Sequence, residues 1–409
     1  MIEENAIVKP LVGQYLETYL PVIDGVVVTV QNYARWLNQE NFSCYVAAAA
    51  AERGYVDTEP YQILRYRSVP VTMHPPYRVG IPWLDLQFLS EQHEVKPDLV
   101  HAHSPFSAGN EALRIARKLK IPLVASFHSK FYDDVLQATG SKFIAERIVG
   151  IVVDFYNKAD YVWTVNQGTA RTLRDYGYKK SIEIMQNGTD FIFPADISAA
   201  REKINQRFGF DNGDKVLLFV GQHILQKNLM MLIEAVGCYA LAGGKFKLLM
   251  VGEGYASQAL ADKAVELGIA DQVVFAGVER DRETLSAIYL RADLFTFPSV
   301  YDNAPLVVRE AAMAKCPSIM IAGSNAAENA VDEVNAYLCQ ENTKSLCQAI
   351  GRALADDEKR REVGLRASQT ICRPWQEIVR DVAVRYREIL AGHKPKQRRP
   401  RRSQTRIWP

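Results

Sequence analysis

Short apolar runs alternate with segments of helical periodicity through most of this chain, and no other feature of the sequence restricts the fold as strongly. Residues 97–103 and 121–128 have the composition of buried strands, and residues 111–119 between them carry apolar side chains at helical spacing. A strand, a helix and a second strand at this spacing form a βαβ unit, so the two strands are expected to lie parallel in one sheet.

The same order recurs in the second half of the chain. The predicted elements there are strands at residues 215–221, 246–252 and 292–298 and a helix at residues 228–242. A chain of 409 residues is too long for one ordinary core. We therefore predict two Rossmann-like, doubly wound α/β domains, residues 1–195 and 196–372, that face each other across a cleft. Such sheets bind ligands beyond the carboxyl ends of their strands, which places the expected site in that cleft.

The end of the chain differs from both domains. Residues 375–390 follow Pro374, a helix-start signal, and carry apolar side chains at helical spacing. We expect residues 373–392 to form a helix that crosses back toward the first domain. The last segment, residues 393–409, contains seven Lys and Arg side chains and no Asp or Glu. A tail of this composition is expected to be disordered in isolation.

Cysteine use and hydropathy indicate the compartment. The six cysteines are scattered without a CxxC pair, as is typical of free thiols in a reducing environment. The first ten residues include Glu3 and Glu4 and lack the apolar core of a signal peptide. No apolar run approaches the roughly 18 residues that span a bilayer. We expect a cytoplasmic protein that contacts membranes only from the surface.

An acidic loop ahead of an apolar helix is the most informative stretch of the sequence. The loop holds Asp302, and the helix is predicted from about Pro305, whose missing N–H suits the first helical turn. The free N–H groups of Leu306 and Val307 at this helix end favour a phosphate. The carboxylate of Glu310, one turn into the helix, is suited to accepting ribose hydroxyls. The alternative is a capped helix, in which Asp302 satisfies backbone groups and Glu310 is solvated.

Residues 301–312, with the sequence YDNAPLVVREAA, resemble the acidic motif of retaining glycosyltransferases of family four, which have the GT-B fold. That motif has two Glu positions around a Gly-containing turn. Here the first position is Asp302, the Gly position is Pro305 and the second position is Glu310, in a form similar to that of a bacterial subgroup. The resemblance implies that Glu310 binds the ribose of a nucleotide and that Asp302 lies near the donor sugar.

Segments of the first domain resemble the same family in the same order. Residues 20–26, LPVIDGV, resemble its first Gly loop, in which Gly25 lets the backbone approach the diphosphate and the sugar because it has no Cβ atom. Asp24 of this loop is expected on the acceptor side. Residues 96–106 and 126–129 resemble the next two strand ends.

Three histidines belong to these two segments. The resemblance implies that His128 contacts the donor; the alternative is a structural histidine. His101 and His103 lack a third partner at a spacing diagnostic of a metal site, so no metal site is expected. We expect His101 to be structural and His103 to line the acceptor side of the cleft.

The second domain opens with a segment, residues 219–228, that resembles the family's diphosphate loop. The family usually has an Arg just after the Gly and a Lys six positions after that Gly, and both cations neutralise the leaving diphosphate. Here the Gly is Gly221 and the Lys is Lys227, but Gln222 replaces the Arg, which puts full activity in doubt. The other expected donor-binding positions are Gly252, Gly254 and, near the base, Val278. The resemblance covers roughly residues 8–390.

The resemblance implies a retaining hexosyltransferase that uses a nucleotide-sugar donor, with UDP-glucose expected because it is the donor that the family uses most often. No cofactor or metal is expected, because fixed cations and helix dipoles take the place of an ion. Two alternatives remain: a sugar-nucleotide 2-epimerase of the same fold and a non-catalytic GT-B membrane or scaffold protein. The substitutions at Gln222 and Asp302 motivate the second, and the aromatic region 61–89 on the acceptor side argues against the first.

The basic tail predicts a partner for the protein. Seven cations and the terminal Ile407-Trp408-Pro409 are suited to an anionic membrane surface. Residues 73–89 add His74, Trp83 and other aromatic side chains in a Pro-containing loop. We therefore expect peripheral membrane binding and a lipid or glycolipid acceptor, with no specific nucleic acid. The alternatives are nonspecific RNA binding or a solubilising tail, with the aromatic side chains packed in the core.

Overall fold

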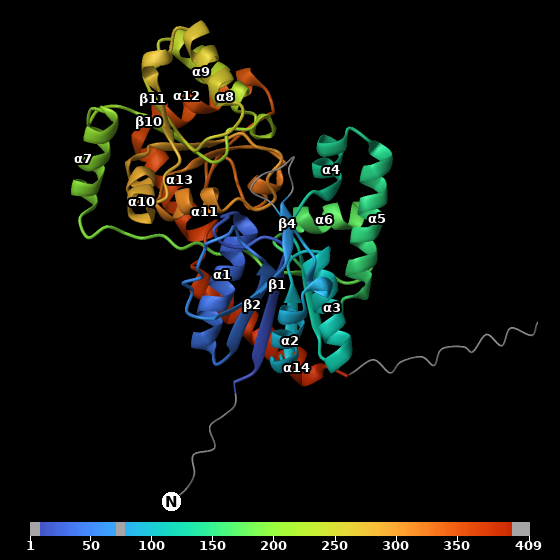
Figure 1. Ribbon diagram of the computed structural model, residues 1–409. Helices are drawn as coiled ribbons and strands as arrows, with labels where there is room; N and C mark the ends of the chain where they lie inside the picture. Colours follow the sequence, from blue (N-terminus) through green and yellow to red (C-terminus); the bar gives the residue numbers. More distant parts are fainter. Residues whose placement is uncertain (1–8, 71–77, 395–409) are drawn as a thin grey trace, which may run out of the picture. The chain divides into compact units, whose positions relative to one another are not determined.

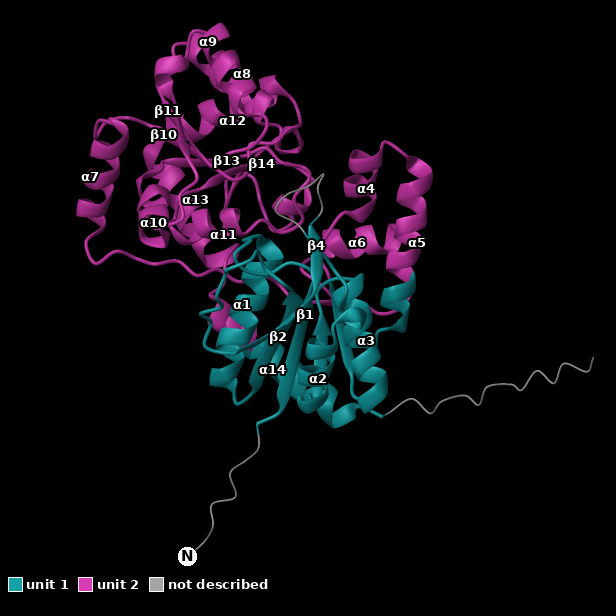
Figure 2. Cartoon of the chain, viewed as in Figure 1, with its two compact units in different colours: residues 1–126, 154–162, 380–409 teal, residues 127–153, 163–379 magenta. Residues whose placement is uncertain are grey.

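The structure, a computed structural model, describes residues 9–70 and 78–394. The chain divides into two compact units (Figure 2). Unit 1 consists of residues 1–126, 154–162 and 380–409, and unit 2 consists of residues 127–153 and 163–379, in both cases within the described ranges.

Unit 1 is built around parallel strands in the order β3-β2-β1-β6-β7, of which β1 and β2 are labelled in Figure 1. The sheet strands are β1 (Leu11–Leu16), β2 (Ser43–Ala49), β3 (Gln62–Tyr66), β6 (Leu99–Ala102) and β7 (Leu123–Phe127), and β4 (Ser68–Pro70) with β5 (Arg78–Gly80) forms an antiparallel pair. The helices are α1 (Gly25–Leu37), α2 (Leu86–Glu94) and α3 (Ser107–Leu119), with 3-10 turns at Asn38–Glu40 and Pro82–Leu84. Strand β1 lies centrally, with Val12 opposite Cys44 of β2 and Leu99 of β6.

Unit 2 holds a second parallel sheet in the order β12-β11-β10-β13-β14-β15. Its strands are β10 (Val216–Val220), β11 (Lys247–Val251), β12 (Val273–Gly277), β13 (Leu294–Phe297), β14 (Ser318–Ile321) and β15 (Tyr337–Cys339). Its helices are α7 (Ile197–Phe208), α8 (Leu229–Leu241), α9 (Ser257–Glu266), α10 (Arg282–Arg291), α11 (Leu306–Met313), α12 (Thr343–Ala355) and α13 (Asp357–Thr370), with 3-10 turns at Leu225–Lys227, Ala270–Gln272 and Asn325–Ala327. Strands β10, β13 and β14 are buried throughout, which explains why their sequences VLLFV, LFTF and SIMI are almost entirely apolar.

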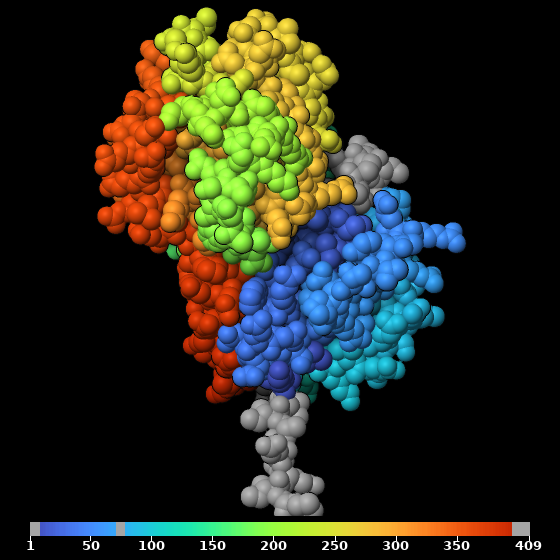
Figure 3. Space-filling view, turned by 90° about the vertical axis from the view of Figure 1, so that its left-hand side faces the viewer, coloured from blue at the N-terminus to red at the C-terminus, as the bar shows by residue number. Residues whose placement is uncertain are grey.

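Unit 2 also contains the segments that follow β7 and β8. These are α4 (Phe131–Thr139), most of α5 (Lys142–Lys158), the second half of β8 (Tyr161–Thr164), α6 (Gln167–Asp175) and β9 (Glu183–Ile184), with β8 and β9 parallel. At the surface of the unit, the green α7 segment covers part of the yellow and orange region to which α10 belongs (Figure 3).

The last helix, α14 (Trp375–Gly392), contributes to both units. Residues up to Val379 belong to unit 2, where a Cβ atom on Gly188 would lie 2.7 Å from the Cα atom of Trp375. Residues from Arg380 belong to unit 1, where Tyr386 is fully buried and its hydroxyl lies 2.6 Å from Nδ1 of His101.

The predicted α/β class is confirmed, since both sheets are parallel and flanked by helices. The predicted strands and helices also occur, with ends that differ by a few residues: the helix predicted at residues 228–242, for example, is α8 (Leu229–Leu241). The boundary near residue 195 and the cleft stay predictions. No helix in the described part of the chain is long and apolar enough to cross a membrane. Residues 395–409, most of the basic tail, lie outside the described residues.

Candidate donor site and family membership

The loop between β13 and α11 in unit 2 carries a shielded ion pair. Lys227 donates from Nζ to both carboxylate oxygens of Asp302, at 2.9 Å to Oδ1 and 2.8 Å to Oδ2. The side chains are only 11% and 22% exposed. The fully buried Ser299 donates to Oδ2 of Asp302 at 2.6 Å, which fixes the carboxylate further. Two groups predicted for the donor site, 75 residues apart in sequence, therefore meet.

The backbone and an aromatic ring hold the ammonium of Lys227 at the carboxyl ends of two neighbouring strands. Lys227 ends a 3-10 turn in the loop after β10, and the next residue, Asn228, has a left-handed backbone with φ of 54°. Nδ2 of Asn228 donates to the carbonyl oxygen of Pro298, just after β13, at 3.2 Å. Nζ of Lys227 lies 5.3 Å from the ring centroid of Phe297, the last residue of β13. Parallel sheets bind their ligands at this edge.

Glu310 is buried with one hydrogen-bond donor at each carboxylate oxygen, and it is not solvated as in the alternative stated above. Its side chain is 9% exposed. Oε1 accepts from Arg282 at 2.8 Å, and Oε2 accepts from the hydroxyl of Tyr289 at 2.9 Å. Burial raises the pKa of Tyr289 well above its usual value, so the hydroxyl keeps its proton and remains a donor. Each carboxylate oxygen retains a second lone pair for a ligand hydroxyl.

The start of α11 has the properties of an anion site. Pro305 is the N-cap residue, and no side-chain hydrogen bond caps the helix. Leu306 and Val307 form its first turn and are half-buried. Asp302 therefore pairs with Lys227 and does not satisfy the helix start. The backbone N–H groups at this end carry partial positive charge and favour a negatively charged group.

His128 follows β7 and belongs to unit 2. It is half-buried, and removal of water from the ring lowers its pKa to about 4, so the imidazole is neutral near pH 7. Its carbonyl oxygen accepts from Nδ2 of Asn303 at 2.7 Å. The structure thus ties the histidine expected at the donor to the residue that follows Asp302.

The predicted glycines of unit 2 are explained by packing within the protein. Gly252 has a φ of +127°, and a Cβ atom there would lie 2.0 Å from the carbonyl oxygen of Gly221. A Cβ atom on Gly254 would lie 2.2 Å from the carbonyl oxygen of His223. The loops after β10 and β11 are therefore packed too closely for side chains at these positions. Gln222 is exposed beside Gly221, and Val278 after β12 is 55% exposed.

The predicted residues of unit 1 have different surroundings. Asp24 is the N-cap of α1, and its Oδ1 accepts from the backbone amides of Val26 and Val27 at 2.9 Å each. Gly25, the first residue of α1, is exposed, and a Cβ atom there would meet no described atom within 4 Å. Its missing side chain leaves open space. His103 is only 5% exposed, with Nε2 at 2.8 Å from Oε1 of Gln14.

Two family models match the chain. The model of glycosyl transferases group 1 matches residues 200–370, and the model of Glycosyltransferase Family 4 matches residues 23–191. The chain belongs to glycosyltransferase family 4. The resemblance stated from the acidic motif is confirmed, as is the prediction of an enzyme of this class.

Relatives of this glycosyltransferase act on several substrates. The chain is 24% identical over 313 residues to the alpha-monoglucosyldiacylglycerol synthase of Streptococcus pneumoniae, and the match covers 75% of this chain and 70% of that protein. The chain is 23% identical over 401 residues to the GDP-mannose-dependent alpha-mannosyltransferase of Corynebacterium glutamicum, and the match covers 94% of this chain and 91% of that protein. The structure of Anabaena HepE in complex with UDP and glucose superposes with a TM-score of 0.73 at 17% identity, covering 93% of this chain and 99% of that one. The predicted GT-B fold is confirmed.

Sequence reasoning missed several residues around the site of this glycosyltransferase. Arg282 and Tyr289 hold Glu310, and Ser299 holds Asp302. Arg282 follows Asp281, which caps α10, so its surroundings in the sequence indicate only a helix start. Asn303 looks like an ordinary turn residue. Among residues 9–70 and 78–394, no three His, Cys, Asp or Glu side chains gather closely enough to hold a metal ion.

Proposed function

We propose that this glycosyltransferase moves a hexosyl group from a nucleoside diphosphate sugar, UDP-glucose or a close analogue, to a hydroxyl group of a membrane lipid, with retention of the anomeric configuration. One observation carries the proposal. The ion pair of Lys227 and Asp302 lies at the carboxyl ends of β10 and β13, in the loop that leads into the uncapped start of α11. A cation and free backbone amides together favour a diphosphate.

The proposed reaction is a front-face displacement. The bond from the sugar C1 atom to the diphosphate oxygen breaks, and the acceptor oxygen bonds to C1 on the same face. The acceptor proton passes to the departing diphosphate. The ammonium of Lys227 and the amides of Leu306 and Val307 stabilise the charge that develops on the leaving group. Glu310 holds the ribose, Asp302 lies near the sugar, and neutral His128 contacts the donor. Lys227 and the helix end take the role of a metal ion, so none is required.

Relatives support a nucleotide-sugar donor without fixing its base. The HepE structure contains UDP, and the mannosyltransferase relative is named for GDP-mannose. Val278, exposed after β12, is the proposed neighbour of the base. A comparison of UDP- and GDP-sugars in the assay below decides between them.

An apolar surface of unit 1 and a relative's name support a lipid acceptor. The exposed apolar side chains of the β4–β5 pair, of the 3-10 turn Pro82–Leu84 and of the start of α2 are Val69, Val79, Trp83, Leu84 and Leu86. Trp83 is 58% and Leu86 is 81% exposed, and Arg67 nearby in sequence is exposed too. Apolar and indole side chains beside a cation suit a lipid headgroup region. By contrast, Phe88 is only 1% exposed and belongs to the core, while His74 and Tyr77 lie outside the described residues.

A transfer assay tests the proposed reaction. Purified protein is incubated with UDP-glucose or GDP-mannose and with vesicles that contain diacylglycerol, in the presence and absence of EDTA. We expect a glycosylated lipid whose anomeric configuration, read by NMR, matches that of the donor, and we expect the same rate in EDTA. Epimerised donor without transfer would indicate the epimerase reaction. An inverted product, or activity that needs added Mg²⁺, would contradict the mechanism.

Vesicle co-sedimentation tests the membrane partner separately. Binding should rise with the fraction of anionic lipid and fall with salt, because the attraction is electrostatic. It should weaken in Trp83→Ser and after deletion of residues 393–409. The exposed Val265 on α9, replaced by Ser, is a control in unit 2. If the intact protein does not bind anionic vesicles at low salt, the lipid acceptor is wrong and a soluble acceptor becomes the proposal.

A further inference from the structure

We propose that Asn303 is a positioning residue that holds His128 in a fixed place relative to the ion pair of Lys227 and Asp302. The inference rests on the proposed function, because it assigns His128 and Asp302 to the donor. Asn303 directly follows Asp302 and precedes the start of α11, so a shift of its backbone moves both Asp302 and the amides at the start of α11. No comparison or motif singles out this residue; its contacts do.

Asn303 is bonded to three segments that are distant in sequence. Its Nδ2 donates to the carbonyl oxygen of His128 after β7 at 2.7 Å. Its Oδ1 accepts from Nδ2 of Asn325 after β14 at 3.0 Å. Its backbone oxygen accepts from Nδ2 of Asn166 after β8 at 2.7 Å. All four residues belong to unit 2.

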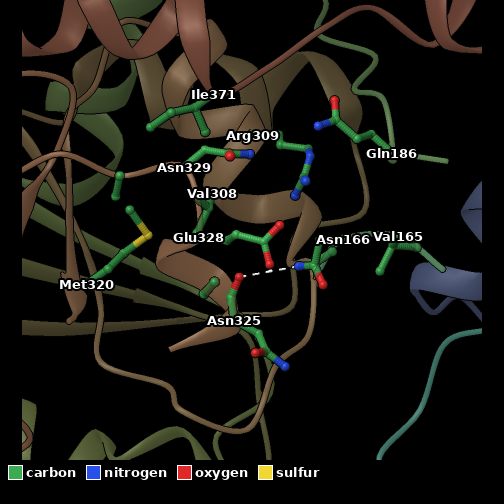
Figure 4. A pocket seen from close by; sticks show the side chains of 13 residues that line it. Val165, Asn166, Gln186, Val308, Arg309, Met320, Asn325, Glu328, Asn329 and Ile371 are labelled. Carbon is green, nitrogen blue, oxygen red and sulfur yellow. Dashed lines mark hydrogen bonds between the residues drawn. The ribbon is translucent and has the colours of Figure 1, made fainter. Parts of the chain in front are cut away.

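The partners of Asn303 are themselves held in place. Asn166 is 5% exposed, and its Oδ1 caps α6 by accepting from the amide of Thr169 at 2.8 Å. Nδ2 of Asn166 also donates to the carbonyl oxygen of Asn325 at 3.3 Å, the dashed contact in Figure 4. The two asparagines line a small pocket together with Arg309 and Glu328 (Figure 4). Asn303 therefore anchors the loop between β13 and α11 to residues that are themselves held by hydrogen bonds.

Two further contacts join the loop just before Asn303 to the segment that follows His128. Nζ of Lys130 donates to the carbonyl oxygen of Val300 at 2.9 Å, and the hydroxyl of Tyr301 donates to Asp134. These contacts hold the segments together when the bond from Asn303 is lost. The role left for Asn303 is the exact orientation of His128 relative to Asp302, which affects the chemical step more than the fold.

The amide group is suited to this task because it donates and accepts at the same time. Asn303→Asp keeps an oxygen for Asn325 but removes the donor to His128 and places a negative charge against its carbonyl oxygen. When the new carboxyl group is protonated, its O–H restores a donor. The variant therefore separates the bond to His128 from the bond to Asn325 without a change in size.

The test compares wild type, Asn303→Asp and Asn303→Ala in the transfer assay, with Asn329→Asp, an exposed position of the same pocket, as the matched control for charge. We expect kcat to fall about 10- to 100-fold in both Asn303 variants, because small misplacements of reacting groups cost rates of this order. We expect the affinity for free UDP and the melting temperature to stay close to wild type. The ratio of kcat of Asn303→Asp to that of wild type should rise as the pH falls through the pKa of the new carboxyl group.

Wild-type kcat in Asn303→Asp, or equal losses of kcat, UDP affinity and melting temperature, would overturn the proposal. A ratio that does not change with pH would do so as well. His128→Ala is measured in parallel. If His128→Ala has wild-type kcat, the assignment of His128 to the donor fails, which is a failure of the proposed function. If His128→Ala is slow while Asn303→Asp is not, only the positioning role of Asn303 fails.

Discussion

Two clusters of polar side chains, one in each unit, differ in kind. The cluster in unit 1 consists of His, Gln, Ser and Tyr side chains: His101 bonds to Tyr386 at 2.6 Å and to Ser126 at 2.8 Å, and Gln14 bonds to His103 at 2.8 Å. The cluster in unit 2 consists of ion pairs, Lys227 with Asp302 at 2.8 Å and Arg282 with Glu310 at 2.8 Å. Unit 1 has ion pairs as well, such as Arg114 with the buried Glu111, but they lie outside its cluster.

The difference indicates which cluster is better suited to an anion. A network of hydrogen-bonded His, Gln, Ser and Tyr side chains can be satisfied completely inside the protein, so it specifies packing. A buried ion pair costs desolvation and contributes little net stability, which makes it weak evidence for a structural role. The pair of Lys227 and Asp302 also lies at the carboxyl ends of two parallel strands, where such sheets bind ligands, so it is better explained by a ligand that carries charge. Open space at Gly25 is the corresponding feature of unit 1, and it suits the close approach of a neutral backbone to a ligand.

The largest expected effect is that of Lys227→Ala. If the ammonium stabilises the leaving diphosphate, kcat should fall by ~10²–10³-fold, the scale for removing one preorganised donor. KM for the donor should change much less, because the interaction strengthens in the transition state. Steady-state kinetics measures both. Lys215→Ala, which removes the ion pair with Asp357 in the same unit, is the control and should leave kcat unchanged. A rise in KM alone would reduce Lys227 to a binding residue.

The next effect is on nucleotide affinity. Glu310→Ala should weaken binding of the free nucleotide by about 1–3 kcal/mol, the scale for loss of a charged hydrogen-bond partner, as calorimetry would measure. Glu310→Gln keeps an oxygen that accepts from Tyr289 and should lose less nucleotide affinity than Glu310→Ala. If Glu310→Ala lowers the melting temperature but leaves nucleotide affinity intact, the carboxylate serves only Arg282 and Tyr289. The charges of unit 2 would then be structural after all.

Elements of the fold were predictable because their signals are local. The apolar run 292–298 became β13, and Pro305 marked the start of α11. The contacts between charges were not predictable in the same way. Lys227 and Asp302 lie 75 residues apart, and only the adjacency of β10 and β13 brings them together.

The burial of side chains in unit 1 is harder to predict than its strands. His103 is only 5% exposed and bonded to Gln14, a contact that the sequence does not indicate, and its place at a cleft stays a prediction. Strand β6 is covered on both faces, so the alternation that marks a half-exposed strand is absent from its sequence. Asn303 was missed for a related reason, since its three bonds reach segments that no local pattern connects to it.

Loss of a hydrogen bond from the network around His101 in unit 1 should have a smaller effect, on the stability of the fold. Tyr386→Phe removes the hydroxyl that bonds to His101 and accepts from Gln14, which leaves buried polar groups without a partner. The free energy of unfolding should fall by about 1–2 kcal/mol in chemical denaturation, with donor affinity unchanged. Tyr55→Phe, at an exposed tyrosine of unit 1, should have no effect. A loss of nucleotide affinity in Tyr386→Phe would remove the distinction between a structural and a ligand-binding unit.

The smallest expected effect is a gain. Gln222 is exposed beside Gly221, at the position where the family usually has an arginine, and the loop after β10 presents a single cation, Lys227. Gln222→Arg should raise kcat a few-fold, because a second cation adds to the stabilisation of the leaving diphosphate while an exposed charge is partly screened by solvent. Gln258→Arg on α9 adds the same charge to an exposed position and controls for long-range attraction of the anionic donor. A higher kcat in both variants would indicate only long-range attraction of the donor by added positive charge, and the increase should then vanish at high salt. A loss of activity in Gln222→Arg alone would mean that turnover requires a single cation in this loop. Glutamine at this position would then contribute to activity rather than reduce it.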